Sequence, residues 1–383
     1  MYRLSAEQKR IVQDFATMAD RDIAPHANRT DREAAFPSES IAALRAHGLL
    51  GLTVPAAFGG MGEGVRTTAA ILDEMSQRCS STSMIYLMHL CGVACYAAAP
   101  DKTSSYLTQA ATGNHLSTLA FSEPGSRSHF WAPVSRGAEV DGGLRLSGRK
   151  SFVTSAGHAD GYVVSTLDPG AQSPVATTIC LVLRGDNGLT VSGTWDGLGL
   201  RGNASAPMTL DGVMVSSERM LSQPGKGLDV MLEVVLPLFQ VGVAAVALGI
   251  AEAAVQRTQR HLTTSRLEHM NINLAEMPAL RARLAQMRVE TDRARAHLSA
   301  VLDAVETPGP STQLLVLEAK AAATEAAVLV TELGMRACGG AAVGGRLGLD
   351  RLFRDARAPI VMAPTTDQAY DFIGKAMCGM EVF

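Results

Sequence analysis

The feature that most constrains the fold of this chain is a hydrophobic periodicity that changes twice. Apolar residues have helical spacing over the first hundred or so residues, and Ser5 and Gln8 match a capping box. Short β-branched runs punctuated by Gly, Asp and Pro begin near His115. Long Ala- and Leu-rich helical stretches follow from about Gly227. This order excludes the strand–helix alternation of a doubly wound parallel sheet.

We therefore predict an α+β multidomain fold for the 383 residues, a length that suits two or three domains. The predicted units are an N-terminal all-helical domain over 1–115, a β-barrel or β-sandwich domain over 116–222, and a C-terminal four-helix bundle over 223–383. Long bundle helices are expected at 228–266, 274–305 and 312–336, with a break at Thr307-Pro-Gly-Pro.

The charge pattern argues against nucleic acid and anionic membranes as partners. The chain has 34 Lys+Arg and 37 Asp+Glu, a formal charge of −3, and no long basic run. Five arginines (Arg281, Arg283, Arg288, Arg293 and Arg295) share one helical stretch with interleaved acids, and we expect them to be solvated. The longest uncharged run, 234–251, contains Pro237 and Gln240 and predicts a buried bundle helix instead of a membrane span.

The cysteines predict neither disulfides nor a metal site. Six cysteines in so long a chain lack the density and spacing of a disulfide framework. Cys91 and Cys95 would share a helical face, but no nearby Cys or His pair completes a metal site, so we expect core packing. Because the N-terminus turns polar at once, no export signal is predicted and a cytoplasmic location is expected.

One glycine motif is misleading. Gly197-Leu-Gly-Leu-Arg-Gly satisfies GxGxxG, the pyrophosphate turn of dinucleotide-binding folds, but a strand-like segment, Ala206-Pro-Met-Thr-Leu-Asp, follows where a helix would be needed. No GxSxG nucleophile elbow is present in the sequence either. A Rossmann site and a serine hydrolase are therefore both disfavoured.

The informative motifs begin in the β region, and further motifs follow toward the C-terminus. They are Ala120-Phe-Ser-Glu-Pro-Gly, Gly148-Arg-Lys-Ser-Phe-Val-Thr-Ser, Leu198-Gly-Leu-Arg, Leu248-Gly-Ile-Ala, Cys338-Gly-Gly and Arg354-Asp-Ala followed by Thr365. With these motifs in this order, nearly the whole chain resembles the acyl-CoA dehydrogenase superfamily. The resemblance implies a non-covalent FAD between the β domain and the bundle. It also implies a homotetramer or dimer in which a neighbouring subunit closes part of the site.

The resemblance also implies cofactor contacts, residue by residue. Phe121 and Ser122 would contact the edge of the flavin ring, and Ser128 would lie near the pyrophosphate. Phe152 would supply a stacking surface and Thr154 a polar contact near the reactive nitrogen. An apolar face with a few hydroxyls and amides is what a flavin requires. Judged by residue type alone, Ser122 and Thr154 fit equally well as ordinary strand residues with no role in cofactor binding.

Four further positions would hold the ADP part of the cofactor. Arg266, Gly339 and Gly340 would meet it, across a subunit boundary, and Thr365 would meet the phosphate end. The family's Arg-x-x-Phe-Gly motif is degraded around Arg266. Gly339 and Gly340 also match an ordinary helix C-terminus.

The catalytic base of a dehydrogenase is missing. Most family members carry a Glu seven residues after the Arg-Asp-Ala motif, where this chain has Ala363. A minority carry it on the first bundle helix, where this chain has Phe239 followed by Gln240. The nearest acids in sequence are Glu233 and Asp367. Because general base catalysis contributes about 10²–10⁴-fold, a dehydrogenase is not expected to lose both carboxylates.

Oxygenase branches of the superfamily, including the group D indole oxygenases of terpenoid biosynthesis, need no such base. They receive FADH₂ from a separate flavin reductase and pass one oxygen from a flavin hydroperoxide to an aromatic or otherwise apolar small molecule. We expect Phe239, Met362 and Ala363 to line an apolar substrate pocket, and Ser122 to offer a catalytic donor. His89 is expected to face the substrate as a proton acceptor, or else to be a hydrogen-bonded core histidine.

Two alternatives to a monooxygenase stay open at this point. One is an acyl-CoA or acyl-carrier dehydrogenase with a displaced base. The other is a flavin-binding homologue without catalytic activity.

Overall fold

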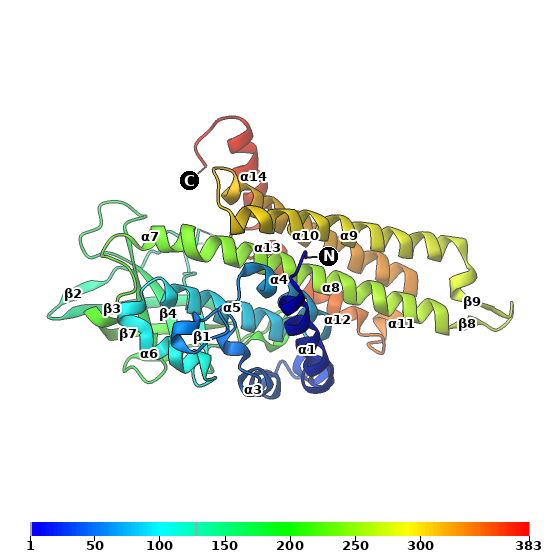
Figure 1. Ribbon diagram of the computed structural model, residues 1–383, viewed down its shortest axis with the longest axis horizontal. Helices are drawn as coiled ribbons and strands as arrows, with labels where there is room; N and C mark the ends of the chain where they lie inside the picture. The colour runs from blue at the N-terminus through cyan, green and yellow to red at the C-terminus, as the bar shows by residue number, and fades with distance from the viewer. Residues whose placement is uncertain (1, 127–128, 383) are drawn as a thin grey trace.

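Long helices extend from a β-sheet region at one end of the molecule to a small hairpin at the other (Figure 1). The computed structural model describes residues 2–126 and 129–382. The long helices are α8 (Leu236–Thr264), α9 (Pro278–Glu306) and α10 (Thr312–Cys338), and the hairpin is formed by β8 (Arg266–Leu267) and β9 (Ile272–Asn273). The bundle prediction is confirmed, with helix ends shifted by several residues.

The N-terminal part is helical, as predicted. Its helices are α1 (Ala6–Asp22), α2 (Ala27–Arg32), α3 (Ser38–Ala46), α4 (Val65–Arg78), α5 (Ser80–Ala97) and α6 (Pro100–Ala111). Ser5 and Gln8 form the predicted capping box, in which each side chain accepts a hydrogen bond from the other residue's backbone N–H. Helix α5 is buried along most of its length and packs against both β1 and α8.

Two sheets pack face to face in the middle of the chain. One has the order β1 (Ser117–Ala120), β4 (Gly161–Leu167), β5 (Thr177–Leu183). The other has the order β2 (Ala138–Val140), β3 (Gly143–Val153), β7 (Ala206–Ser216), β6 (Leu189–Val191). Alternate side chains of both sheets, such as Val164 and Val182 facing Leu146 and Leu210, form one buried cluster. The region is therefore a β-sandwich.

The GxGxxG segment joins this sandwich to the bundle. It forms a loop that leads into strand β7, in agreement with the sequence interpretation. A Cβ added at Gly199 would lie 2.4 Å from the Arg354 carbonyl oxygen, and the next residue, Leu200, donates its N–H to Asp355 Oδ1 at 2.7 Å. These glycines let the loop pack closely on α12 (Leu349–Asp355).

The apolar run in the bundle is a core helix. Residues 227–264 form one helical stretch in which α7 (Gly227–Asp229) and a π-helical segment (Val230–Val235) precede α8. By length and composition it could cross a membrane, but 78% of its most apolar window is buried inside the protein. It packs on α4, α9 and α10. Short helices α11 (Gly340–Val343), α12, α13 (Ala358–Val361) and α14 (Thr366–Met377) complete the chain.

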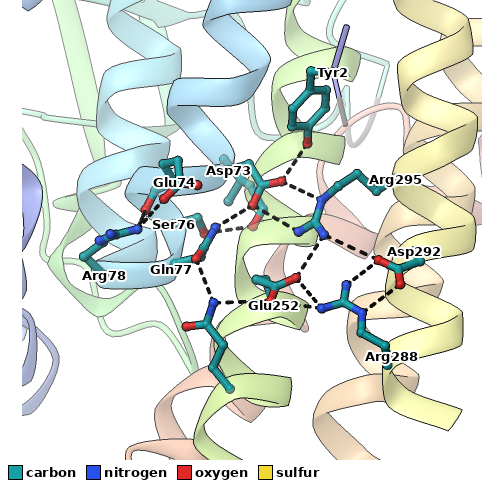
Figure 2. Close-up of polar contacts among 12 residues, drawn as sticks. Tyr2, Asp73, Glu74, Ser76, Gln77, Arg78, Glu252, Arg288, Asp292 and Arg295 are labelled. Atoms are coloured by element: carbon teal, nitrogen blue, oxygen red, sulfur yellow. Dashed lines mark hydrogen bonds and ion pairs between the residues drawn. The ribbon is translucent and has the colours of Figure 1, made fainter. Parts of the chain in front are cut away.

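The prediction of a solvated arginine face is wrong for Arg295. This side chain is buried between α4, α8 and α9, where it pairs with Asp73 and Glu252, each at 2.9 Å (Figure 2). The Tyr2 hydroxyl donates to Asp73 at 2.7 Å. Ion pairs across three helices compensate for the burial of this charge, which one helix's sequence could not reveal. Arg281 and Arg293 are exposed, as predicted.

Cys91 and Cys95 lie in the core, as expected. The described cysteines are free thiols, and no cluster of three or more metal-ligating side chains occurs in residues 2–126 and 129–382.

Candidate functional site

A cavity of about 680 Å³ lies where the β-sandwich meets the helices. Its walls come from α5, from the loops after β1 and β3, from the first turns of α8, and from the connection between α13 and α14. Met84, Leu119, Phe130 and Leu236 are among its apolar lining residues. The π-helical segment before α8 ends at this cavity, which is a common place for such a distortion.

Most of the predicted site residues converge on this cavity. Those lining it are Phe121, Ser122, Phe152, Thr154, Phe239, Met362, Ala363 and Thr365. The set joins segments more than two hundred residues apart in the chain. The structure thus brings these residues to one cavity, and the role of each stays a prediction.

Phe152 reaches the cavity mouth because strand β3 is distorted there. Lys150 pairs with Met208 and Val153 with Ala206, so one extra residue of β3 lies opposite Pro207. Proline has no N–H to donate to the ladder, and a bulge at this point re-aims the side chains. Phe152 has a φ of +54° and an exposed fraction of 68%, and its ring lies edge-on to Trp195. It presents an aromatic surface at the cavity mouth.

Residues with a left-handed backbone and a buried polar atom without a hydrogen-bond partner lie near Phe152. Ser155, Leu200 and Ala204 also have left-handed backbones, which is costly for residues with a side chain. The buried Asn203 lines the cavity, and its Oδ1 has no hydrogen-bond partner within the described residues. A large ligand with polar ring edges would suit this wall, and a flavin is such a ligand.

The loop that follows β1 and carries Phe121 and Ser122, which we call the flavin-motif loop, is held by a buried ion pair. Glu123 pairs with Lys150 of β3, and both side chains are 1% exposed. Glu123 also accepts hydrogen bonds from the N–H groups of Val134 and Ser135, at 2.8 and 2.7 Å. Burial raises the pKa of Glu123, but Lys150 and the Ser135 hydrogen bonds outweigh that effect, so the pKa lies below its ordinary value. Glu123 is thus ionised and already engaged.

No other carboxylate lines the cavity in the part of the chain that the structure describes. Phe239 and Ala363 stand in the cavity wall at the positions where the resemblance places a Glu. Glu233 and Asp367, the nearest acids in sequence, are both exposed and are not lining residues. Among the described residues, the cavity wall therefore offers no free carboxylate as a general base.

His89 does not line the cavity, and the prediction that it faces the substrate is wrong. The side chain is fully buried, with Nε2 2.8 Å from the Leu50 carbonyl oxygen and Nδ1 3.0 Å from the Ser117 N–H. These partners assign a proton to Nε2 and leave Nδ1 as an acceptor. Burial lowers the pKa of His89 to about 4. It is the hydrogen-bonded core histidine that the sequence left open as an alternative.

The residues predicted for the ADP part lie away from this cavity, apart from Thr365. Arg266 is exposed in the β8–β9 hairpin and donates to Asn271. Gly339 and Gly340 are exposed where α10 ends and α11 begins, with Gly339 at a φ of +56°. Their proposed contacts cross a subunit boundary and stay predictions. Ser128 lies outside the described residues.

Lys320 was not anticipated as part of the site. This fully buried side chain of α10 donates hydrogen bonds to the carbonyl oxygens of Met362 and Pro364, at 3.3 and 3.1 Å. It lies on the buried face of α10, in register with Val316 and Thr324. A single charge on an otherwise apolar helical face is the sequence signal that could have identified it.

Comparison with known proteins decides the family. Residues 5–114, 118–213 and 225–378 match the models of the N-terminal, middle and C-terminal domains of acyl-CoA dehydrogenases. The chain belongs to the acyl-CoA dehydrogenase family. Members of this family bind FAD, and the protein is a flavin-dependent oxidoreductase by family. The cavity, with its exposed ring and unpaired amide, fits that cofactor.

Named relatives include dehydrogenases and other flavoproteins. The chain is 26% identical to cyclohex-1-ene-1-carbonyl-CoA dehydrogenase of Syntrophus aciditrophicus (strain SB), over 98% of this chain and 91% of that protein. Butyryl-CoA dehydrogenase from Megasphaera elsdenii has the same fold, with a TM-score of 0.91, 22% identity, and coverage of 98% of this chain and 99% of that one. PigA, solved with FAD and proline, has a TM-score of 0.90, 18% identity, and 99% coverage of both chains.

Proposed function

We propose that this acyl-CoA dehydrogenase family member is a two-component, FADH₂-dependent monooxygenase acting on an aromatic or otherwise apolar small molecule. One observation carries the proposal: Phe239 and Ala363 occupy both base positions in the cavity wall, and the carboxylate of Glu123 is bound to Lys150. Removal of an α-proton from a thioester needs a base within hydrogen-bond reach. An oxygenation has no such requirement.

The overall reaction balances without a carboxylate. One atom of O₂ enters a C–H bond of the substrate, and the other leaves as water after taking up two protons and two electrons. FADH₂ supplies those electrons when bound, and a separate NAD(P)H-dependent flavin reductase would regenerate it. Phe121, Phe130 and Phe239 make the cavity wall apolar, which would limit water around the reacting groups, and the Ser122 hydroxyl is a donor in this wall.

A dehydrogenase with a displaced base is the second candidate, favoured by the names of curated relatives such as the one from Syntrophus aciditrophicus. The exposed positions of Glu233 and Asp367, outside the cavity lining, weigh against it. The homotetramer or dimer stays a prediction, which light scattering of the purified protein would test through the molar mass.

The test compares the two reactions in one preparation. The protein is supplied with FAD, NADH, a flavin reductase and ¹⁸O₂, with indole as the aromatic probe. A product carrying one ¹⁸O atom is expected. In the second arm, oxidised FAD-loaded protein is mixed anaerobically with butyryl-CoA, and the visible flavin absorbance should not bleach. Bleaching by the thioester without any oxygenated product would overturn the proposal.

A single substitution sharpens the comparison. Ala363→Glu places a carboxylate in the cavity wall where the family carries its base, so thioester-dependent bleaching should become faster by about 10²-fold or more. Ala363→Gln is the matched control, with the same size and no basic group. Equal bleaching by the wild type and the Glu variant would show that the chain already holds a base. Failure of the wild type to bind FAD in either redox state would instead indicate a non-catalytic homologue.

A further inference from the structure

Three consecutive backbone carbonyls, in a segment that contributes to the cavity wall, are held by two buried side chains. Lys320 Nζ of α10 donates to the Met362 and Pro364 oxygens, and Gln240 Nε2 of α8 donates to the Ala363 oxygen at 3.4 Å. Met362 and Ala363 line the cavity directly. Side chains of two bundle helices, α8 and α10, thus donate hydrogen bonds to the same short segment, residues 362–364.

The hydrogen bonds of Lys320 also reach the first residue of helix α14. Lys320 Nζ also donates to Thr366 Oγ1 at 3.0 Å, and Thr366 Oγ1 lies 3.0 Å from Thr324 Oγ1. Thr365, which lines the cavity, caps α14 by accepting a hydrogen bond from the Gln368 N–H. One ammonium group therefore contacts both the segment that forms the cavity wall and the first residue of α14.

Lys320 is an unusual residue to bury at this place. Its three acceptors are two carbonyls and a hydroxyl, and no ion pair of Lys320 occurs among the described residues. The charged groups that act on it electrostatically are Glu325, on its own helix, and Asp367, on α14. A buried ammonium without a paired carboxylate is costly, whereas a Met of similar length would fill the space without that cost.

We propose that Lys320 is a positioning residue that holds segment 362–365 in the form that admits the flavin, and that loss of its proton loosens the cavity wall. The ammonium has three N–H donors for three acceptors, whereas the neutral amine has two donors and a lone pair. The neutral amine can still donate to the two carbonyl oxygens, but the Thr366 hydroxyl must then turn from Thr324 Oγ1 to donate to the amine, and none of the three hydrogen bonds is charge-assisted any longer. This role is independent of whether the reaction is an oxygenation or a dehydrogenation.

The local environment places this change within reach of ordinary buffers. Burial lowers the pKa of Lys320 to about 7, against the opposing effect of Glu325 and Asp367. The ammonium thus predominates near pH 6 and the amine near pH 8.5. Flavin affinity should fall over this interval.

The experiment measures FAD binding by fluorescence quenching between about pH 6 and about pH 8.5. For the wild type, replacing charge-assisted hydrogen bonds with weaker neutral ones should raise the dissociation constant roughly fivefold across the interval, with a midpoint near pH 7. Lys320→Met should bind FAD weakly at every pH, without that midpoint. Gln240→Met should weaken binding by a constant factor and keep the wild-type pH profile.

Lys375→Met is the matched control, since Lys375 lies on α14 and pairs with Asp371 away from the cavity wall. It should reproduce the wild-type curve. A pH-independent wild type, or a Lys320→Met protein that keeps the wild-type profile, would overturn the proposal. If Lys320→Met does not fold, Lys320→Arg, which stays charged throughout, should lose the midpoint, and its persistence would overturn the proposal equally.

Discussion

Removing the ammonium of Lys150 should destabilise the protein at the flavin-motif loop. Lys150 of β3 is buried against Glu123, and its Nζ also donates to the Ser165 carbonyl oxygen at 2.6 Å. In Lys150→Met the Glu123 carboxylate stays buried with its hydrogen bonds from Val134 and Ser135, but without its counter-charge. The loop that carries Phe121 and Ser122 would lose its ion pair with β3 and keep the backbone hydrogen bond from the Ser151 N–H to the Ser122 carbonyl oxygen.

The magnitude follows from the burial of both partners. Removing one partner of a buried ion pair typically costs about 3–5 kcal/mol. Three hydrogen bonds to Glu123 survive the substitution, so the lower end, about 3 kcal/mol, is expected. The unpaired carboxyl should then have a pKa above its unfolded value. Because the folded state would hold the proton more tightly, the variant should lose stability as the pH rises above about 4.3, the unfolded-state pKa.

Urea unfolding of the apoprotein at several pH values measures the free energy of unfolding directly. The double variant Glu123→Gln/Lys150→Met removes both charges, and its amide can accept from Ser135 and donate to the freed Ser165 oxygen. It should recover at least about 1.5 kcal/mol relative to Lys150→Met. Lys102→Met, at an exposed lysine, is the control and should cost less than about 1 kcal/mol.

Two results would refute this reasoning. A loss below about 1 kcal/mol in Lys150→Met would mean that the pair contributes no more than a surface ion pair. A double variant as unstable as the single one would mean that packing, and not the uncompensated charge, explains the loss.

Two further predictions concern residues whose roles the structure distinguishes. Burial lowers the pKa of His89 to about 4, whereas its value in the unfolded state is about 6.5. The unfolded state therefore binds the proton first, and the free energy of unfolding should fall as the pH drops from about 6.5 to about 4. Urea unfolding of a His89→Gln variant should show a shallower decline over this interval. Phe152→Ala should weaken FAD binding about two- to tenfold in a fluorescence titration. The melting temperature of the variant should stay near that of the wild type, because the Phe152 ring is largely exposed. A several-degree loss of melting temperature with unchanged FAD affinity would contradict a stacking role.

Much of the fold could be predicted because local patterns and tertiary structure agree. The capping box at Ser5, the change of period near His115 and the break after Thr307 are all properties of short segments. A pyrophosphate-binding role for the GxGxxG segment is disfavoured on the same local basis, because the segment that follows it is strand-like and forms β7. The motifs around Ser122 and Thr154 converge on one cavity, together with Ala363 from the far end of the chain.

The failures have one physical cause, which is that a polar side chain's partners are remote in sequence. Arg295 is buried because Asp73 and Glu252 come to it from two other helices. His89 is a core residue because the backbones at Leu50 and Ser117 occupy both of its nitrogens. Nothing in the sequence near Arg295 or His89 indicates these partners.

By itself, the sequence determined the order of helical, β and helical regions, the family and the absence of a Glu at positions 239 and 363, because these depend on residue types and their spacing. Only the tertiary structure decided that Phe239 and Ala363 face one cavity, that Glu123 is bound to Lys150, and that Lys320 holds the wall. Each of these depends on which groups meet when distant segments pack. Burial then makes every unpaired charge or hydrogen-bonding group costly, so the partners found in the core determine each side chain's role.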